Sequence, residues 1–349
     1  MSLTRSIADR INPVLRVMGA QLVGNKQLAH YQSVREKYLP EVNDPGDSLE
    51  LPRGAEAFLR LENPRLAELC NRYRSYQCPA TLSAIWTQSH ISLIDLARFR
   101  NDNPYVFQRF DNNGEVAHTL TAYYLQQNDS LGLLERLEED GLFGAQTYVF
   151  DGRFLVSRDL LDSINEINFL EQTIGISKRA GLTVLDIGAG YGRFAHRLTS
   201  ALPRFRKVLC TDAIATSSFL CEYYLRFRGA SSAAVVPLDE VEQSMGRQQI
   251  DLAVNIHSFS ECRMEAVQWW LDLVRAHRVR FLFIVPNAVS EGGRKLALHN
   301  KAGSGALDYE PQIIRRGYKK IVARPKYESA TVQRSGVSPT WYHLFELMK

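Results

Sequence analysis

The feature that most constrains the fold is a glycine-rich turn within residues 181–198. Residues 182–187 form a short apolar run rich in branched side chains and bounded by glycines, which is typical of a buried parallel strand. Gly188, Gly190 and Gly192 follow at two-residue spacing, and a helical pattern then begins. Such a turn lets unpaired N–H groups at a helix start approach a ligand closely. The turn therefore predicts a nucleotide site.

The spacing of the turn indicates which kind of nucleotide. The residues read D-x-G-x-G-x-G, with Asp186 at the strand end, whereas a dinucleotide fold requires G-x-G-x-x-G. The next apolar strand ends at Asp212, where an acid can hold ribose hydroxyls. A glycine turn without a ligand would not explain that second acid. These residues resemble motif I and the following acid of class I methyltransferases, which use S-adenosylmethionine. The resemblance implies that this cofactor is held by Asp186, Gly188, Ala189, Gly190, Gly192 and Asp212.

Strand patterns and helix patterns alternate after residue 182, and two strands without an intervening helix follow at the end. This order predicts an α/β fold with five parallel strands and a closing antiparallel pair. It is similar to the Rossmann-like, seven-stranded class I methyltransferase sheet. The predicted strands are residues 184–187, 208–211, 233–237, 250–256, 279–285, 317–323 and 340–348.

The first 140 residues lack sustained strand alternation and show helical stretches instead. A hairpin with a turn at Asp151-Gly152 follows, and Ser157 then caps a helix over 159–173. We therefore expect two regions, a helical cap for substrate recognition over residues 1–145 and a cofactor-binding domain over 146–349. The predicted cap helices are residues 28–38, 54–60, 65–73, 81–99, 115–127 and 131–139.

Composition limits the partners. Lys and Arg total 42 and Asp and Glu total 38, and the resulting charge of +4 is too slight to predict binding to nucleic acid. No apolar run reaches the ~20 residues that span a bilayer. The arginine-bearing N-terminus fits a transit peptide, a membrane-surface helix or an ordinary first helix, and Asp9 favours the last. Five scattered cysteines indicate reduced thiols and a cytoplasmic location. The apolar cap helices could also form a dimer interface, so a homo-oligomer is a further alternative.

Methyl transfer to a hydroxyl requires in-line positioning and a group that accepts the proton. His257 lies just beyond the fourth strand, and an ordinary pKa near neutrality would suit it as the general base. Glu261 lies close enough in sequence to orient His257 or to bind a second hydroxyl. The alternative is that His257 only bonds the backbone or forms the floor of the site.

Three further residues lie at predicted strand ends. Asp239 follows the third strand, where folds of this class contact adenine, although a solvated acid is an equal alternative. Asn255, at the end of the fourth strand, is a further candidate cofactor contact. Asp239 and Glu261 could lie near one another, but no adjacent acidic pair follows strand four or five. We therefore predict no metal site.

Residues 315–326 contain six basic side chains and no acid. One interpretation is a patch for a phosphate-bearing substrate, and the other is a solvated helix end and edge strand.

Four segments resemble the sugar O-methyltransferases of natural-product and surface-polysaccharide pathways, over roughly residues 145–290. They are 157–170, 185–193, 251–261 and 281–287. The chain departs from that family in two respects. In the family a Leu/Ile-Pro pair commonly follows the acid after the second strand, and the segment Asp212–Ile214 lacks the proline. The predicted cap, residues 1–140, shows no match. The resemblance implies a hydroxyl acceptor on a sugar, nucleotide sugar or glycoside. A non-sugar small-molecule acceptor, a protein acceptor and a non-catalytic binding protein of the same fold remain alternatives.

Overall fold

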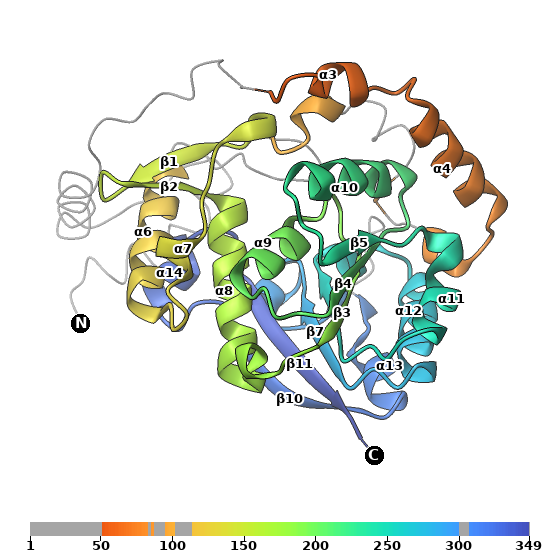
Figure 1. The fold of residues 1–349 in the computed structure, drawn as a ribbon. Helices are drawn as coiled ribbons and strands as arrows, with labels where there is room; N and C mark the ends of the chain where they lie inside the picture. Colours follow the sequence, from red (N-terminus) through yellow and green to blue (C-terminus); the bar gives the residue numbers. More distant parts are fainter. Residues whose placement is uncertain (1–50, 83–84, 87–94, 102–113, 300–306, 349) are drawn as a thin grey trace, which may run out of the picture.

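A seven-stranded sheet forms the centre of the molecule (Figure 1). The computed structural model describes residues 51–82, 85–86, 95–101, 114–299 and 307–348. Across the sheet the order is β10-β11-β7-β6-β3-β4-β5. The five strands from β7 to β5 run parallel, while β11 is antiparallel to both β7 and β10. This order confirms the predicted class I methyltransferase fold. The strands are β3 (Thr183–Ile187), β4 (Lys207–Thr211), β5 (Ala233–Val235), β6 (Leu252–Ile256), β7 (Phe281–Val285), β10 (Tyr318–Pro325) and β11 (Trp341–Leu347).

The central strands are apolar because helices cover both faces of the sheet. Every residue of β3 and β7 is buried. Alternate side chains of β3 point to opposite faces, so Leu185 and Ile187 join one apolar cluster while Val184 joins the other. Asp186 therefore lies on the Val184 face, which α8 (Arg158–Ile174) and α9 (Arg193–Ala201) cover.

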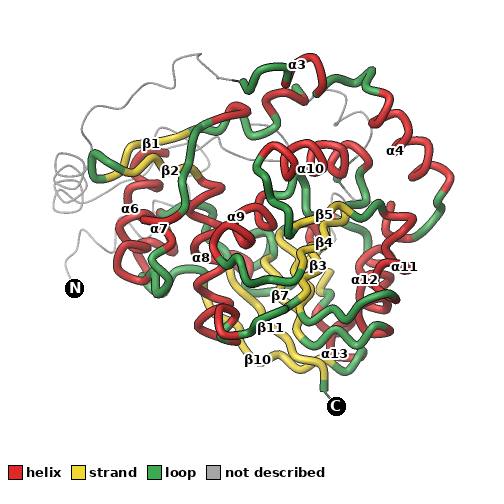
Figure 2. The backbone as a smooth tube through the Cα atoms, in the orientation of Figure 1, coloured by secondary structure: helices red, strands yellow, loops and turns green. Residues whose placement is uncertain are grey.

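Figure 2 shows the remaining helices of the sheet region in red. They are α10 (Ala215–Phe227), α11 (Val241–Gly246), α12 (Met264–Ala276), α13 (Glu310–Arg315) and α14 (Ala330–Ser335). Helix α14 lies between β10 and β11, where the sequence analysis expects no helix, so that prediction is wrong. Its six residues are too few for a helical period to show in the sequence, and Ser329 caps it through the N–H of Val332.

Helices from the N-terminal part pack directly on the sheet region. Helix α4 contacts α10, and the hydroxyls of Tyr73 and Ser218 lie 2.7 Å apart. Helix α6 contacts α8 and α14. The described N-terminal residues thus share the two apolar clusters of the sheet. The elements are α3 (Ala55–Phe58), α4 (Pro64–Ser75), α6 (Gly114–Asn128), α7 (Leu133–Arg136) and the hairpin β1 (Thr147–Phe150) and β2 (Phe154–Ser157).

Two predicted cap helices fall wholly or largely outside the described residues. These are the helix over 28–38 and the central part of the helix over 81–99. The described ends of the second carry only the 3-10 turns Pro79–Thr81 and Leu96–Arg98, so a continuous α-helix over 81–99 is wrong. Two short strands, β8 (Ala297–Leu298) and β9 (Leu307–Asp308), pair beside the sheet.

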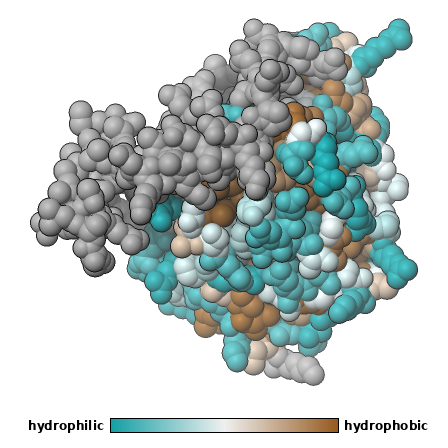
Figure 3. Space-filling model, turned by 90° about the vertical axis from the view of Figure 1, so that its left-hand side faces the viewer, coloured by the Kyte–Doolittle hydropathy of each residue, from teal (hydrophilic) through white to brown (hydrophobic). Residues whose placement is uncertain are grey.

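Hydrophilic side chains predominate on the described surface seen in Figure 3, with hydrophobic ones scattered among them. This mixture is ordinary for a folded protein. Among the described residues, no helix has the length and apolar character needed to cross a membrane.

Candidate active site

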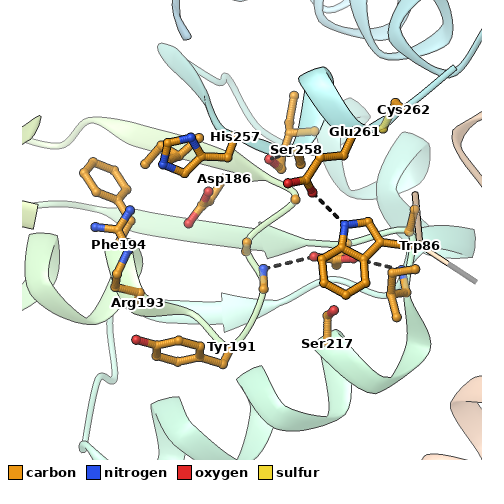
Figure 4. Close-up of a pocket in the computed structure, with 18 of the residues that line it drawn as sticks. Trp86, Asp186, Tyr191, Arg193, Phe194, Ser217, His257, Ser258, Glu261 and Cys262 are labelled. Carbon is orange, nitrogen blue, oxygen red and sulfur yellow. Dashed lines mark hydrogen bonds between the residues drawn. The ribbon is translucent and has the colours of Figure 1, made fainter. Parts of the chain in front are cut away.

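A cavity opens at the carboxyl ends of β3, β4 and β6, the edge where ligands of open α/β sheets bind (Figure 4). It includes the glycine turn, the end of β4 and His257. In Figure 4, Trp86, Glu261 and Cys262 lie toward one end, and Tyr191, Arg193 and His257 lie toward the other. Ala80, Thr81 and Trp86 bring part of the N-terminal region into the wall.

The three glycines of the turn serve different purposes, although all have positive φ. A Cβ on Gly188 would lie 2.1 Å from Ser258 Oγ, and one on Gly192 would lie 2.8 Å from Cys221 Sγ. A Cβ on Gly190 would meet no non-adjacent atom of the described residues within 4 Å. Gly190 thus leaves its space to the cavity, whereas Gly192 permits packing of α9 on α10 and does not line the cavity.

Asp212 stands beside Gly190, as the sequence analysis expects. Its Oδ2 accepts a hydrogen bond from the Gly190 N–H at 3.0 Å, and its Oδ1 accepts one from Ile214 at 2.8 Å. Burial raises the pKa of Asp212 to about 6. Both oxygens keep further lone pairs for a ligand donor. The carboxylate therefore faces the cavity already aligned by the backbone.

Asp186 also lines the cavity and is buried. Its Oδ2 has no hydrogen-bond partner among the described residues. Burial raises its pKa to about 7, while the Arg193 guanidinium opposes that shift. A buried acceptor without a donor is costly, so this oxygen indicates a place for a ligand donor.

His257 lines the cavity in a strained backbone conformation, with φ 69°. The backbone N–H of His257 donates to the Val285 carbonyl at 2.7 Å. The ring Nδ1 is buried without a partner among the described residues. Burial, aided by Arg158 and Arg193, lowers its pKa to about 3. The expected pKa near neutrality is therefore wrong, because the sequence alone shows neither the burial nor the two guanidinium groups. At neutral pH the ring is uncharged and can accept a hydrogen bond.

Asn255 and Asp239 lie outside the cavity wall. The Asn255 amide donates to the Ile187 carbonyl at 2.9 Å and accepts from the Phe259 N–H at 2.9 Å, which braces the turn after β6 against β3. Asp239 accepts two hydrogen bonds from Arg72 of α4, at 2.8 and 2.9 Å. The structure thus does not bring either residue to the candidate site.

Glu261 lines the cavity, but its carboxylate does not hydrogen-bond to His257. Oε2 accepts from the Trp86 indole at 2.6 Å, and Oε1 accepts from the Asn287 amide at 2.8 Å. Burial raises the pKa of Glu261. The residue therefore holds Trp86 at the end of the cavity opposite His257 (Figure 4).

A set of charged side chains that the sequence patterns do not predict lies at the His257 end. Arg193 forms a two-pronged ion pair with Glu166, at 2.8 and 3.0 Å. Lys326 pairs with Asp162 and is buried, so this member of the basic run 315–326 is not a surface group. Arg158, Asp162 and Glu166 recur every four residues along α8. That four-residue spacing of charged side chains along one face of the helix is the signal that could have revealed them. The cavity wall at this end includes Arg158, Asp159, Asp162, Tyr191 and Arg193.

No protein-family model matches the chain, and no curated protein sequence matches it. Solved structures with a similar fold include three methyltransferases. Precorrin-6y C5,15-methyltransferase from Geobacter metallireducens GS-15 is 13% identical over 53% of this chain and 88% of that chain, with a TM-score of 0.35. Magnesium protoporphyrin IX methyltransferase from Synechocystis PCC 6803, with bound S-adenosylmethionine, is 13% identical over 69% of this chain and 99% of that chain, with a TM-score of 0.39. A SAM-dependent methyltransferase from Aquifex aeolicus is 12% identical over 51% of this chain and 89% of that chain, with a TM-score of 0.35.

Proposed function

We propose that this protein is an S-adenosylmethionine-dependent O-methyltransferase that acts on a hydroxyl of a sugar or sugar-containing small molecule. One observation carries the proposal: the carboxylate of Asp212 is fixed by Gly190 at the cavity, where Gly190 leaves open space. An aligned acid beside an exposed glycine backbone suits the diol of a ribose.

The two ends of the cavity match the two ends of the cofactor. Trp86 lies at one end of the cavity, and the wall also includes Ala213, Ile214 and Trp270, which together offer apolar and aromatic surface to a purine (Figure 4). The other end carries acids and guanidinium groups, which suit a zwitterionic amino-acid group. The unpartnered Asp186 Oδ2 lies in this wall and would accept from an ammonium. We therefore assign the cofactor to Asp186, Gly188, Ala189, Gly190 and Asp212.

When bound, S-adenosylmethionine supplies an electrophilic methyl group on a sulfonium. The chain must then hold the acceptor oxygen in line with that methyl group. His257 can accept a hydrogen bond from the hydroxyl through Nδ1, in the tautomer that carries its proton on Nε2. Its pKa of about 3 makes it a weak base toward a neutral alcohol. The acceptor oxygen becomes strongly acidic as its new bond to carbon forms, so His257 takes the proton late.

The sugar acceptor is supported by the resemblance of residues 157–170 and 251–261 to sugar O-methyltransferases. Hydroxyl groups would also satisfy the buried acceptor at His257 Nδ1. In this proposal residues 1–145 recognise the acceptor. The presence of Ala80, Thr81 and Trp86 in the cavity wall is consistent with that role.

A methyl-transfer screen tests the proposal. The purified protein is incubated with methyl-labelled cofactor and with sugars, nucleotide sugars and glycosides, and the products are read by mass. RNA, a porphyrin and a protein extract serve as separate arms. We expect a mass increase of one methyl group on a sugar hydroxyl. Methylation only in another arm would refute the sugar acceptor, and no cofactor binding would refute the methyltransferase.

A further inference from the structure

Asp159, in the first turn of α8, has one carboxylate oxygen that accepts hydrogen bonds from described residues and one that does not. Oδ2 accepts from Arg100 Nε at 3.2 Å and from the Tyr191 hydroxyl. Oδ1 accepts no hydrogen bond from any described residue. The side chain is only 4% exposed, yet it belongs to the cavity wall. The structure thus presents a carboxylate oxygen without a described donor in the wall at the mixed-charge end of the cavity.

The two donors to Asp159 are themselves held firmly. Arg100 is completely buried and also donates to Glu139 at 2.7 Å and to the Leu142 carbonyl at 3.2 Å. Tyr191 belongs to the glycine turn, between Gly190 and Gly192. The orientation of the Asp159 carboxylate is therefore tied both to the N-terminal region and to the turn that faces the ligand.

We propose that Asp159 is a further cofactor-binding residue, which accepts a hydrogen bond from the α-ammonium of the cofactor's amino-acid group. This inference rests on the proposed function. A buried carboxylate gains most from a donor that is itself charged, because charge-assisted hydrogen bonds are stronger than neutral ones. Asp159 is hydrogen-bonded to Tyr191, which lies at the end of the cavity where the proposed function places the amino-acid group. Tyr191 acts as a positioning residue, since its hydroxyl orients Oδ2.

The test compares two ligands that differ in the amino-acid group. S-adenosylhomocysteine retains the ammonium, whereas methylthioadenosine keeps the nucleoside and lacks the whole amino-acid portion. Calorimetry gives the Kd of each for wild type and D159N. We expect D159N to raise the Kd for S-adenosylhomocysteine about 10-fold or more, which is the usual effect of losing a charge-assisted hydrogen bond. Binding of methylthioadenosine should not change.

A second pair of variants keeps the test decisive if D159N does not fold. Tyr191→Phe removes only the hydroxyl that orients Asp159. Tyr224→Phe is the matched control, because its ring packs on that of Tyr191 at 5.1 Å while its hydroxyl lies near His196 instead. We expect Tyr191→Phe to lower the affinity for S-adenosylhomocysteine but not for methylthioadenosine. Tyr224→Phe should leave the affinity for both ligands unchanged.

Two results would overturn the inference and differ from each other. If Asp159 and Tyr191 variants weaken both ligands equally, or neither, then Asp159 does not contact the amino-acid group while the proposed function stands. If wild type binds neither ligand, the proposed function itself fails.

Discussion

The N–H of Gly190 and Oδ2 of Asp212 form a hydrogen bond of 3.0 Å that joins the loops after two neighbouring strands, β3 and β4. Apart from the adjacent residues, no atom of the described residues stands within 4 Å of the place where a Gly190 side chain would begin. The bond therefore aligns an acid at the wall of the cavity without filling it. The proposed cofactor site depends on this arrangement.

Gly190→Ala and Gly192→Ala should fail in different ways. Both place a side chain at positive φ, which costs roughly 1–2 kcal/mol of stability. At Gly192 the new methyl group also meets Cys221 Sγ at 2.8 Å, and overpacking adds roughly 1–3 kcal/mol. Gly190→Ala should instead retain most stability and lose affinity for S-adenosylhomocysteine. Urea unfolding and calorimetry measure the two effects, and equal losses in both variants would contradict the assignment.

His257→Asn should separate catalysis from binding. Asparagine tolerates positive φ, so the variant should fold. We expect kcat to fall by about 10²–10⁴, the usual contribution of a proton acceptor. The Kd for S-adenosylhomocysteine should stay close to that of wild type. Near-normal kcat in His257→Asn would refute the role of His257.

Asp186 predicts that binding of S-adenosylhomocysteine depends on pH. Its pKa of about 7 leaves the side chain largely neutral at lower pH. The ionised form attracts the ligand ammonium, so affinity should rise by up to about 10-fold per pH unit as pH increases toward 7 and then level off. Calorimetry across this range should show that rise, and D186N should reduce it, leaving the contribution of Asp212, whose pKa is about 6. A slope that persists unchanged in D186N would assign it to another group.

Stability of the free protein should show the opposite trend from the same residue. The folded-state pKa of Asp186 lies above its ordinary value, so the folded state binds the proton more tightly. The stabilisation is complete below the ordinary pKa of about 4 and is lost as pH rises through about 7. Urea unfolding of wild type and D186N should show the stability of D186N gaining on that of wild type over this interval. A constant difference would contradict the raised pKa.

Much of this chain could be predicted because the signals are local. The predicted strands 184–187 and 208–211 match β3 and β4 to within one residue. An apolar run bounded by glycines is sufficient to locate β3, and an apolar run that ends at Asp212 is sufficient to locate β4. The glycine turn and Asp212 meet at the cavity for the same reason, since carboxyl ends of neighbouring parallel strands share one edge.

The remaining assignments depended on partners far away in the sequence. The sequence position of Asp239 is that of an adenine contact, but in the structure Arg72 of α4 pairs with its carboxylate. Glu261 lies four residues from His257, yet Trp86 holds its carboxylate at the other end of the cavity. Asp159 gives no local sign that Arg100 fixes one of its oxygens. Local patterns cannot show which distant cation or donor a carboxylate meets.

Arg100 should matter far more to stability than a partly exposed arginine does. Arg100→Met would remove one of the two guanidinium groups that pair with the buried Glu139, the other being that of Arg197, and breaking a buried ion pair typically costs about 3–5 kcal/mol. Arg65→Met removes a pair with Glu222 that is partly exposed, and it should cost about 0–1 kcal/mol. Urea unfolding of the two variants measures the contrast. Similar losses would show that the buried network is not the stronger one.

Calorimetric titration with S-adenosylhomocysteine tests the central claim most directly, with D212N and D239N as a matched pair. Both variants remove one carboxylate charge after a strand, but only Asp212 lines the cavity. We predict that wild type and D239N bind with similar Kd and that D212N binds at least about 10-fold more weakly. Absence of binding to wild type, or equal affinity in D212N and wild type, would contradict the claim that Asp212 holds the cofactor.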